Sequence, residues 1–171
     1  MVSQRELLEA IKTLVFTPKT IVSCPVTPIK ISGSNSSGAY TANDAMGLIT
    51  KLAVPKSGEI RSAMLLDLDD EGTQIDLEIF KRSITQIASE DAWSPSDVDM
   101  LHFVAELAFV VGDDQINSYS FQLSNIGVAY NAPEGFFYIQ AVTRSTPTIA
   151  VNSEPRIQLQ ILSFDPDFEG N

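Results

Sequence analysis

The sequence predicts an all-β protein, an antiparallel β-sandwich or jelly roll with a short helical arm at its N-terminus. From residue 40 onward, short segments rich in β-branched and aromatic residues recur between Gly-, Pro- and Asp-rich turns. Several of these segments alternate strictly between apolar and polar residues, which is typical of antiparallel strands. Strands and helices do not alternate, so a doubly wound enzyme fold is not expected. We predict two parts, an arm over residues 1–38 and a β-sandwich domain over residues 39–171.

The arm begins with a predicted helix from Ser3 to about Phe16. Ser3 and Glu6 have the spacing of a capping box, and Pro18 ends the segment because the residue before a proline disfavours the α region. The apolar residues recur at helical spacing and form one stripe, the candidate interface of the chain: Leu7, Leu8, Ile11, Leu14 and Val15. The stripe could pack on its own domain or dock on a neighbouring subunit, and the sequence leaves both possibilities open.

The rest of the arm is predicted to be extended. Residues 20–31 are rich in β-branched residues and are interrupted by Pro25 and Pro28, which indicates an edge strand because proline cannot donate a ladder hydrogen bond. Residues 32–38 form a Ser- and Gly-rich loop. This loop contains the sequon Asn35-Ser36-Ser37, which we interpret as loop chemistry rather than a glycosylation site.

Eight strands are predicted in the domain: Ala45–Val54, Glu59–Leu68, Gln74–Lys81, Leu101–Val111, Ser118–Leu123, Gly135–Val142, Thr148–Val151 and Arg156–Phe164. In the third of them, the alternation places Ile75 with its apolar partners on a buried face and places Asp76 and Glu78 on a solvated one. Residues 94–100 have the N-cap and Pro-at-N1 pattern of a single helical turn that leads into the next strand. A longer helix over 94–107 is the alternative.

Composition and charge exclude several classes of function. The chain of 171 residues has 22 acidic and 11 basic residues and a net charge of −11, which is the wrong sign for gripping nucleic acid. No apolar run reaches the length of a membrane span, so we expect no membrane partner. The N-terminus lacks a signal-peptide pattern and Cys24 is the only cysteine, so we expect synthesis in a reducing compartment. The charge is graded: residues 1–60 are mildly basic, and the remainder carries the whole deficit.

Two clusters could carry chemistry, and both have a simpler interpretation. Residues 67–72 with Glu78 match a calcium-loop skeleton, but the flanking segments are predicted strands, which favours an acidic hairpin turn. The single histidine, His102, could act as a general base with Asp97 or Asp99, although a structural role is favoured. There is no G-x-S-x-G, P-loop or G-x-G-x-x-G motif. We therefore predict no enzyme activity, no catalytic residues, no metal and no cofactor.

Five short motifs over residues 39–164 occur in an order that resembles a family of small tailed-phage structural proteins. They are Ala39-Tyr40-Thr41-Ala42-Asn43-Asp44-Ala45-Met46-Gly47, the glycine turn and strand from Ser57-Gly58 to Asp69, the strand Asp76–Phe80, the passage Ala92-Trp93-Ser94-Pro95-Ser96-Asp97, and the aromatic strand Phe136–Val142 with the turn at Thr146-Pro147. Such proteins are similar to capsid decoration (cement) proteins. Compared with the family pattern, the helix over 3–16 and the extended segment after it look like an added arm.

The resemblance implies a virion protein with no catalytic residues. The expected function is to decorate and stabilise a tailed-phage capsid by binding between capsid subunits, at the capsid surface. The expected partners are the major capsid protein and further copies of the chain, as a homotrimer, with the arm clipping onto a neighbour. The alternatives are a head-fibre base, a tail or baseplate component, or a carbohydrate- or calcium-binding β-sandwich module.

Overall fold

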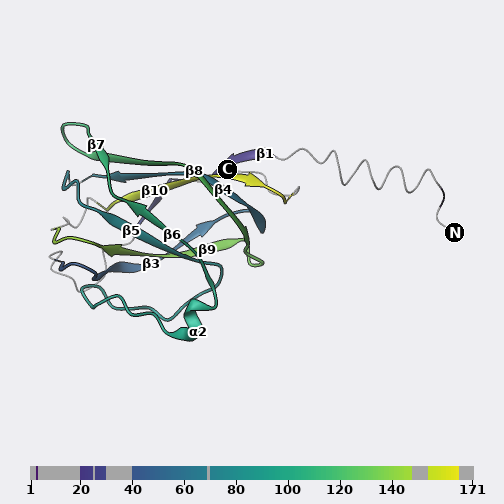
Figure 1. Cartoon of the computed structure of the whole chain (residues 1–171), viewed down its shortest axis with the longest axis horizontal. Helices are drawn as coiled ribbons and strands as arrows, with labels where there is room; N and C mark the ends of the chain where they lie inside the picture. Colours follow the sequence, from purple (N-terminus) through teal and green to yellow (C-terminus); the bar gives the residue numbers. More distant parts are fainter. Residues whose placement is uncertain are drawn as a thin grey trace.

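Two antiparallel sheets pack face to face in the computed structural model, which describes residues 3, 20–24, 26–29, 40–68, 70–147 and 154–165 (Figure 1). The larger, six-stranded sheet contains β1 (Thr20–Ser23), β2 (Thr27–Pro28), β4 (Ser57–Asp67), β7 (Gly112–Asp114), β8 (Tyr119–Asn131) and β10 (Arg156–Ser163). The four-stranded sheet contains β3 (Ala45–Ala53), β5 (Ile75–Phe80), β6 (Phe103–Phe109) and β9 (Phe136–Thr143). The predicted all-β sandwich is confirmed.

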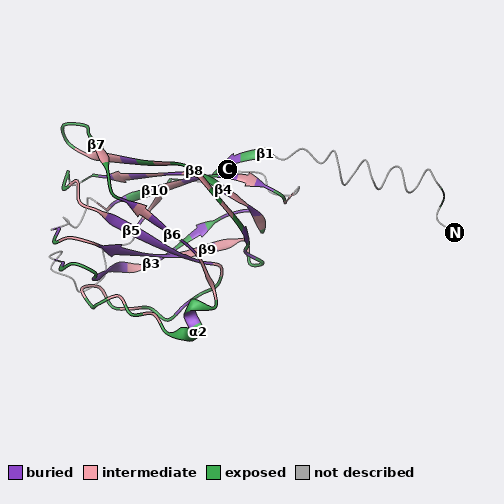
Figure 2. Cartoon of the chain, in the orientation of Figure 1, coloured by how far each residue is buried: buried purple, intermediate pink, exposed green. Residues whose placement is uncertain are grey.

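The strand order of each sheet brings distant segments together. In the larger sheet the order is β1-β10-β4-β8-β7, with β2 also paired to β10, and in the smaller sheet it is β3-β9-β5-β6. The inward residues of both sheets form one apolar core, in which Phe109 of β6 meets Phe121 of β8 edge to face at 6.4 Å between ring centroids. Leu65, Leu77 and Phe137 are buried in the same core (Figure 2). Period-two patterning therefore directs one face of each sheet inward.

The strand boundaries follow the sequence with two differences. β8 continues to Asn131, beyond the predicted end at Leu123, and β7 was not expected. The alternation in β8 breaks where Asn125 and Gly127 have positive φ and where the register with β4 shifts, so the pattern hides a continuous strand. The predicted strand Thr148–Val151 and residues 4–16 of the predicted helix, with its stripe Leu7, Leu8, Ile11, Leu14 and Val15, lie outside the described residues.

The expected edge strand is confirmed over the described part of residues 20–31. β1 and β2 both pair with β10, and β1 is the last strand at its end of the sheet. Cys24, just after β1, is buried, and its N–H donates to the Leu159 carbonyl oxygen at 2.9 Å. Burial raises the pKa of the Cys24 thiol to about 12, so the thiol stays protonated at neutral pH and is unreactive as a nucleophile.

The helix α2 (Asp97–Met100) is the predicted single turn, and the alternative of a helix over 94–107 is wrong. Its N-cap is Ser96 rather than Ser94: the Ser96 Oγ accepts a hydrogen bond from the Asp99 N–H at 3.1 Å. The chain turns at Leu101 and enters β6 at Phe103, where alternation resumes because the strand must present one side to the core.

The acidic segment after β4 leads to β5, which lies in the other sheet, so the predicted hairpin turn is wrong. The connection depends on Gly72. The Gly72 N–H donates to Asp67 Oδ2 at 3.0 Å, and Gly72 has a φ of +59°. A Cβ built there would lie 2.7 Å from Cε2 of Tyr119. Both the positive φ and the close approach of the Tyr119 ring therefore require glycine at this position.

We expect Gly72→Ala to lower the free energy of unfolding more than Gly127→Ala does. Both substitutions carry the left-handed penalty of about 1–2 kcal/mol, but a Cβ at Gly127 meets only Glu59 Oε1, at 3.9 Å. The clash with Tyr119 should add roughly 1 kcal/mol or more. Urea denaturation of the two variants and the parent measures the difference, and equal losses would contradict the steric argument.

Candidate functional site

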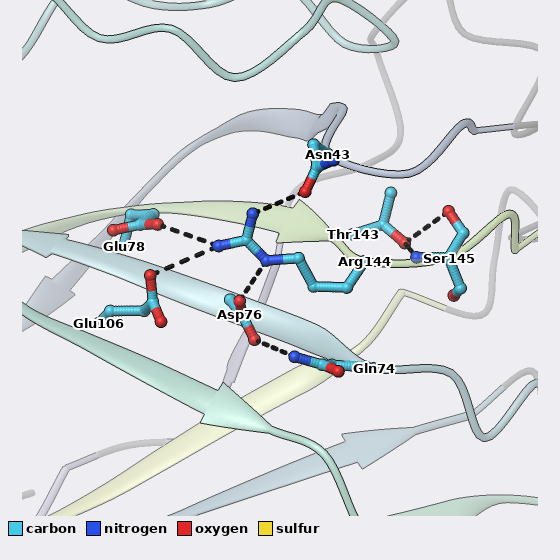
Figure 3. A network of polar contacts seen from close by, with 8 residues as sticks. All are labelled: Asn43, Gln74, Asp76, Glu78, Glu106, Thr143, Arg144 and Ser145. Atoms are coloured by element: carbon cyan, nitrogen blue, oxygen red, sulfur yellow. Dashed lines mark hydrogen bonds and ion pairs between the residues drawn. The ribbon is translucent and has the colours of Figure 1, made fainter.

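The most concentrated polar cluster among the described residues surrounds Arg144, which directly follows β9. Its guanidinium is the only cation of a network that contains Asp76 and Glu78 of β5, Glu106 of β6 and Asn43 of the turn before β3 (Figure 3). We call these five residues the Arg144 network. Outward residues of β5 and β6 thus meet Arg144 just after the end of β9, because β5 lies between β9 and β6.

Each nitrogen of the guanidinium has its own partner. Nε donates to Asp76 Oδ2, Nη1 donates to Asn43 Oδ1 at 2.9 Å, and Nη2 donates to Glu106 Oε2 at 3.4 Å. Nη2 also lies 3.8 Å from Glu78 Oε1. The Asp76 side chain is 2% exposed, and its second oxygen accepts a hydrogen bond from Gln74 Nε2 at 3.1 Å. Asp76 therefore has the best-satisfied carboxylate of the three.

Glu78 and Glu106 face each other directly across the β5–β6 pair. Like charges at opposing positions repel, and Glu78 is only 6% exposed at its side chain. Burial and the facing Glu106 carboxylate raise the pKa of Glu78 to about 7 against the opposing effect of Arg144. The pair therefore holds a proton near neutral pH.

The outer side of the four-stranded sheet is covered by residues 81–96 and α2, which lie on the side away from the six-stranded sheet in Figure 1. Gln140, the register partner of Glu78 on β9, donates from Nε2 to the carbonyl oxygens of Gly47 and Ile87 at 3.2 and 3.1 Å. The Gln140 side chain is fully buried, and its Oε1 has no hydrogen-bond partner. Trp93 packs near Phe80 with ring centroids 6.3 Å apart.

This covering corrects the prediction that Asp76 and Glu78 lie on a solvated face. All six residues of β5 are buried, so the strand is covered on both sides, and Glu78 is not explained by solvation. Alternation of apolar and polar residues could not reveal a covering segment, since residues 81–96 have no strand or helix periodicity. The signal that could have been used is Arg144, an isolated cation in an acidic stretch directly after an apolar strand.

The other candidate clusters do not form a common site. Glu78 of the calcium-loop skeleton belongs to the Arg144 network, whereas Asp67 is buried at the end of β4 and accepts from Gly72. Where the structure describes the chain, which excludes Asp69, no group of three or more His, Cys, Asp or Glu side chains could hold a metal ion. The Asp99 carboxylate accepts hydrogen bonds from Ser96 Oγ at 2.7 Å and the Thr85 N–H at 3.2 Å, which is a capping role beside His102.

The residues of the first resembling motif hold a turn. Asp44 Oδ2 accepts from the Thr41 N–H at 2.7 Å and from Thr41 Oγ1 at 2.8 Å, and Gly47 has a φ of +62°. The turn places the Asn43 side chain beside Arg144, so this motif supplies the one neutral partner of the guanidinium in the Arg144 network. Through these hydrogen bonds and ion pairs, Arg144 links the end of β9 to β5, to β6 and to the turn before β3.

Comparison with known proteins finds no family model and no curated protein that matches this sequence. In the described part of the chain, no helix is long and apolar enough to cross a membrane.

Proposed function

We propose that this chain is a structural virion protein that decorates and stabilises a tailed-phage capsid by binding between capsid subunits as a homotrimer. The ordered motifs over residues 39–164 support this proposal, and so does the two-sheet sandwich that carries them. The function is mechanical rather than catalytic: apolar area buried at subunit junctions would hold the shell against internal pressure, at about 25 cal/mol per Å².

The observation that carries the proposal is an exposed apolar turn built by one of these motifs. The passage from Ala92 to Asp97 leads into α2, where Val98 is 68% exposed, and Leu101, the C-cap of α2, is 73% exposed. These two residues are three apart on a helical turn, so their side chains are neighbours. Asp99 on the same turn is fixed by Ser96 and by Thr85, which makes the turn a preorganised contact.

Co-sedimentation with capsid shells that lack this protein, taken from the phage that encodes it, tests the proposal. The full chain should pellet with the shells, and the double substitution Val98→Asp and Leu101→Asp should weaken binding at least about tenfold. Val111→Asp is the matched control, because Val111 is 82% exposed before β7 in the other sheet. Failure of the full chain to bind shells would overturn the function, and equal binding by both variants would overturn the role of α2.

The arm has its own test in the same assay. If the stripe of Leu7, Leu8, Ile11, Leu14 and Val15 clips onto a neighbour in the shell, deletion of residues 1–18 should reduce the bound fraction. Unchanged binding would overturn the clip and leave the contribution of α2 standing.

A further inference from the structure

The outer face of the six-stranded sheet is unusual for a chain of this charge. Outward residues of β4, β8 and β10 form adjacent rows, since Met64 faces both Gln158 and Gln122 and Ser62 faces both Gln160 and Ser124. These residues are half-buried or exposed. We call this surface the neutral face; its central residues are Ser62, Met64, Leu66, Gln122, Gln158 and Gln160.

The neutral face differs from the chain as a whole in its balance of acidic and basic residues. The charged residues that border it are Glu59 and Arg61 of β4, Arg156 of β10 and Asp113 of the adjacent strand β7, two acids and two bases. Glu59 and Arg61 pair with each other at 3.3 Å. Because the whole chain has a net charge of −11, two copies repel each other through acidic surfaces, but they can approach through this one without like-charge contact.

The apolar content of the face also indicates a covered surface. A solvated sheet face normally alternates apolar-in with polar-out, yet β4 reads Ala63-Met64-Leu65-Leu66, with apolar residues on both sides. At the edge, Ile21 of β1 stands opposite Leu162 of β10 and is 61% exposed. The pattern is that of a strand packed on both faces.

We propose that the neutral face binds a second copy of this chain. Serine and glutamine carry both donors and acceptors, so rows of these residues can hydrogen-bond to a copy of themselves, whereas a face of one charge cannot. The apolar side chains of Met64, Leu66 and Leu162 supply the buried area. A face that binds a copy of itself gives a two-fold pair, which is a different contact from the ring contact of the proposed homotrimer. The inference therefore goes beyond the proposed function and does not require capsid binding.

Light scattering coupled to size-exclusion chromatography of the full chain at micromolar concentrations tests the inference without capsids. The parent protein should have the mass of a dimer or of a larger even-numbered oligomer, and the mass of a trimer would contradict the two-fold contact. The double substitution Gln122→Glu and Gln160→Glu, which places like charges on facing copies, should weaken association by about 100-fold. Gln160 Oε1 already accepts a hydrogen bond from Ser62 Oγ at 3.1 Å, and a glutamate can keep that bond.

The control changes the net charge equally at another place. Gln115 and Asn117 are exposed in the turn between β7 and β8, and Gln115→Glu with Asn117→Asp should leave the mass unchanged. A monomeric parent, an unaffected face variant, or equal dissociation of the control would each overturn the inference. A monomer that still binds shells would overturn the inference alone, whereas an oligomer that fails to bind them would overturn only the proposed function.

Discussion

Arg144→Met is expected to lower the free energy of unfolding at pH 8 by about 3 kcal/mol, since it leaves three carboxylates without their cation. Methionine keeps the apolar stem of the side chain, so the loss reports on charge and hydrogen bonding more than on packing. The greatest part should come from Asp76, whose carboxylate is 2% exposed and bonds to Nε. Urea denaturation of the variant and the parent measures the loss.

Arg61→Met is the matched control for this substitution. Arg61 contacts Glu59 at 3.3 Å but is 48% exposed, so its removal should cost less than about 1 kcal/mol. The loss from Arg144→Met should shrink below pH 7, where the Glu78 carboxyl takes up its proton. Equal losses for the two arginines would show that the Arg144 network contributes no more than a surface pair.

Glu78→Gln is expected to stabilise the protein at pH 8 and to leave its stability at pH 4 almost unchanged. The pKa of Glu78 is about 7 in the folded protein, against 4.5 for an unperturbed glutamate. Between these two values the native state binds more protons than the unfolded state, so stability is fully present below about pH 4.5 and is lost as the pH rises through 7. The loss is on the order of a few kcal/mol, and glutamine removes it because it never ionises.

Urea denaturation from pH 4 to pH 8 measures this effect as the slope of stability against pH. Glu106→Gln should flatten the slope as well, because the Glu106 carboxylate is one cause of the raised pKa. Asp91→Asn neutralises an exposed carboxylate and should leave the slope as it is. A slope that Glu78→Gln does not change would rule out Glu78 as its source.

How far the sequence predicts this molecule depends on whether the determining interaction is local. Alternation in residues 75–80 identifies the strand and its inward residues, because a period of two is written into neighbouring positions. The facing of Glu78 and Glu106 depends on a β5–β6 register set by the long connection between these strands, which no local pattern encodes. The hydrogen bonds of Asp76 likewise depend on Arg144, which follows a strand far away in the sequence.

The single helical turn was predictable, but its cap was not. Ser94 and Ser96 both suit an N-cap, and the choice of Ser96 follows from Asp99, which reaches Thr85 on another segment. Arg144 was visible as an isolated cation, yet its partners come from three other parts of the chain. Contacts between distant segments therefore determine which serine caps the helix and which residues pair with Arg144, and local sequence patterns do not encode such contacts.

The pairing of β1 with β10 has a consequence for how the chain folds. Thr20 lies opposite Ser163, and β10 separates β1 from the central strand β4. During synthesis, β1 and β4 therefore cannot pair with β10 until residues 156–163 have been made. Contacts of such long sequence separation slow the search for the native state, so we expect folding on the millisecond-to-second scale typical of β-sandwiches. Until β10 arrives, β4 exposes an unpaired edge, and newly made chains are most prone to aggregate in that interval.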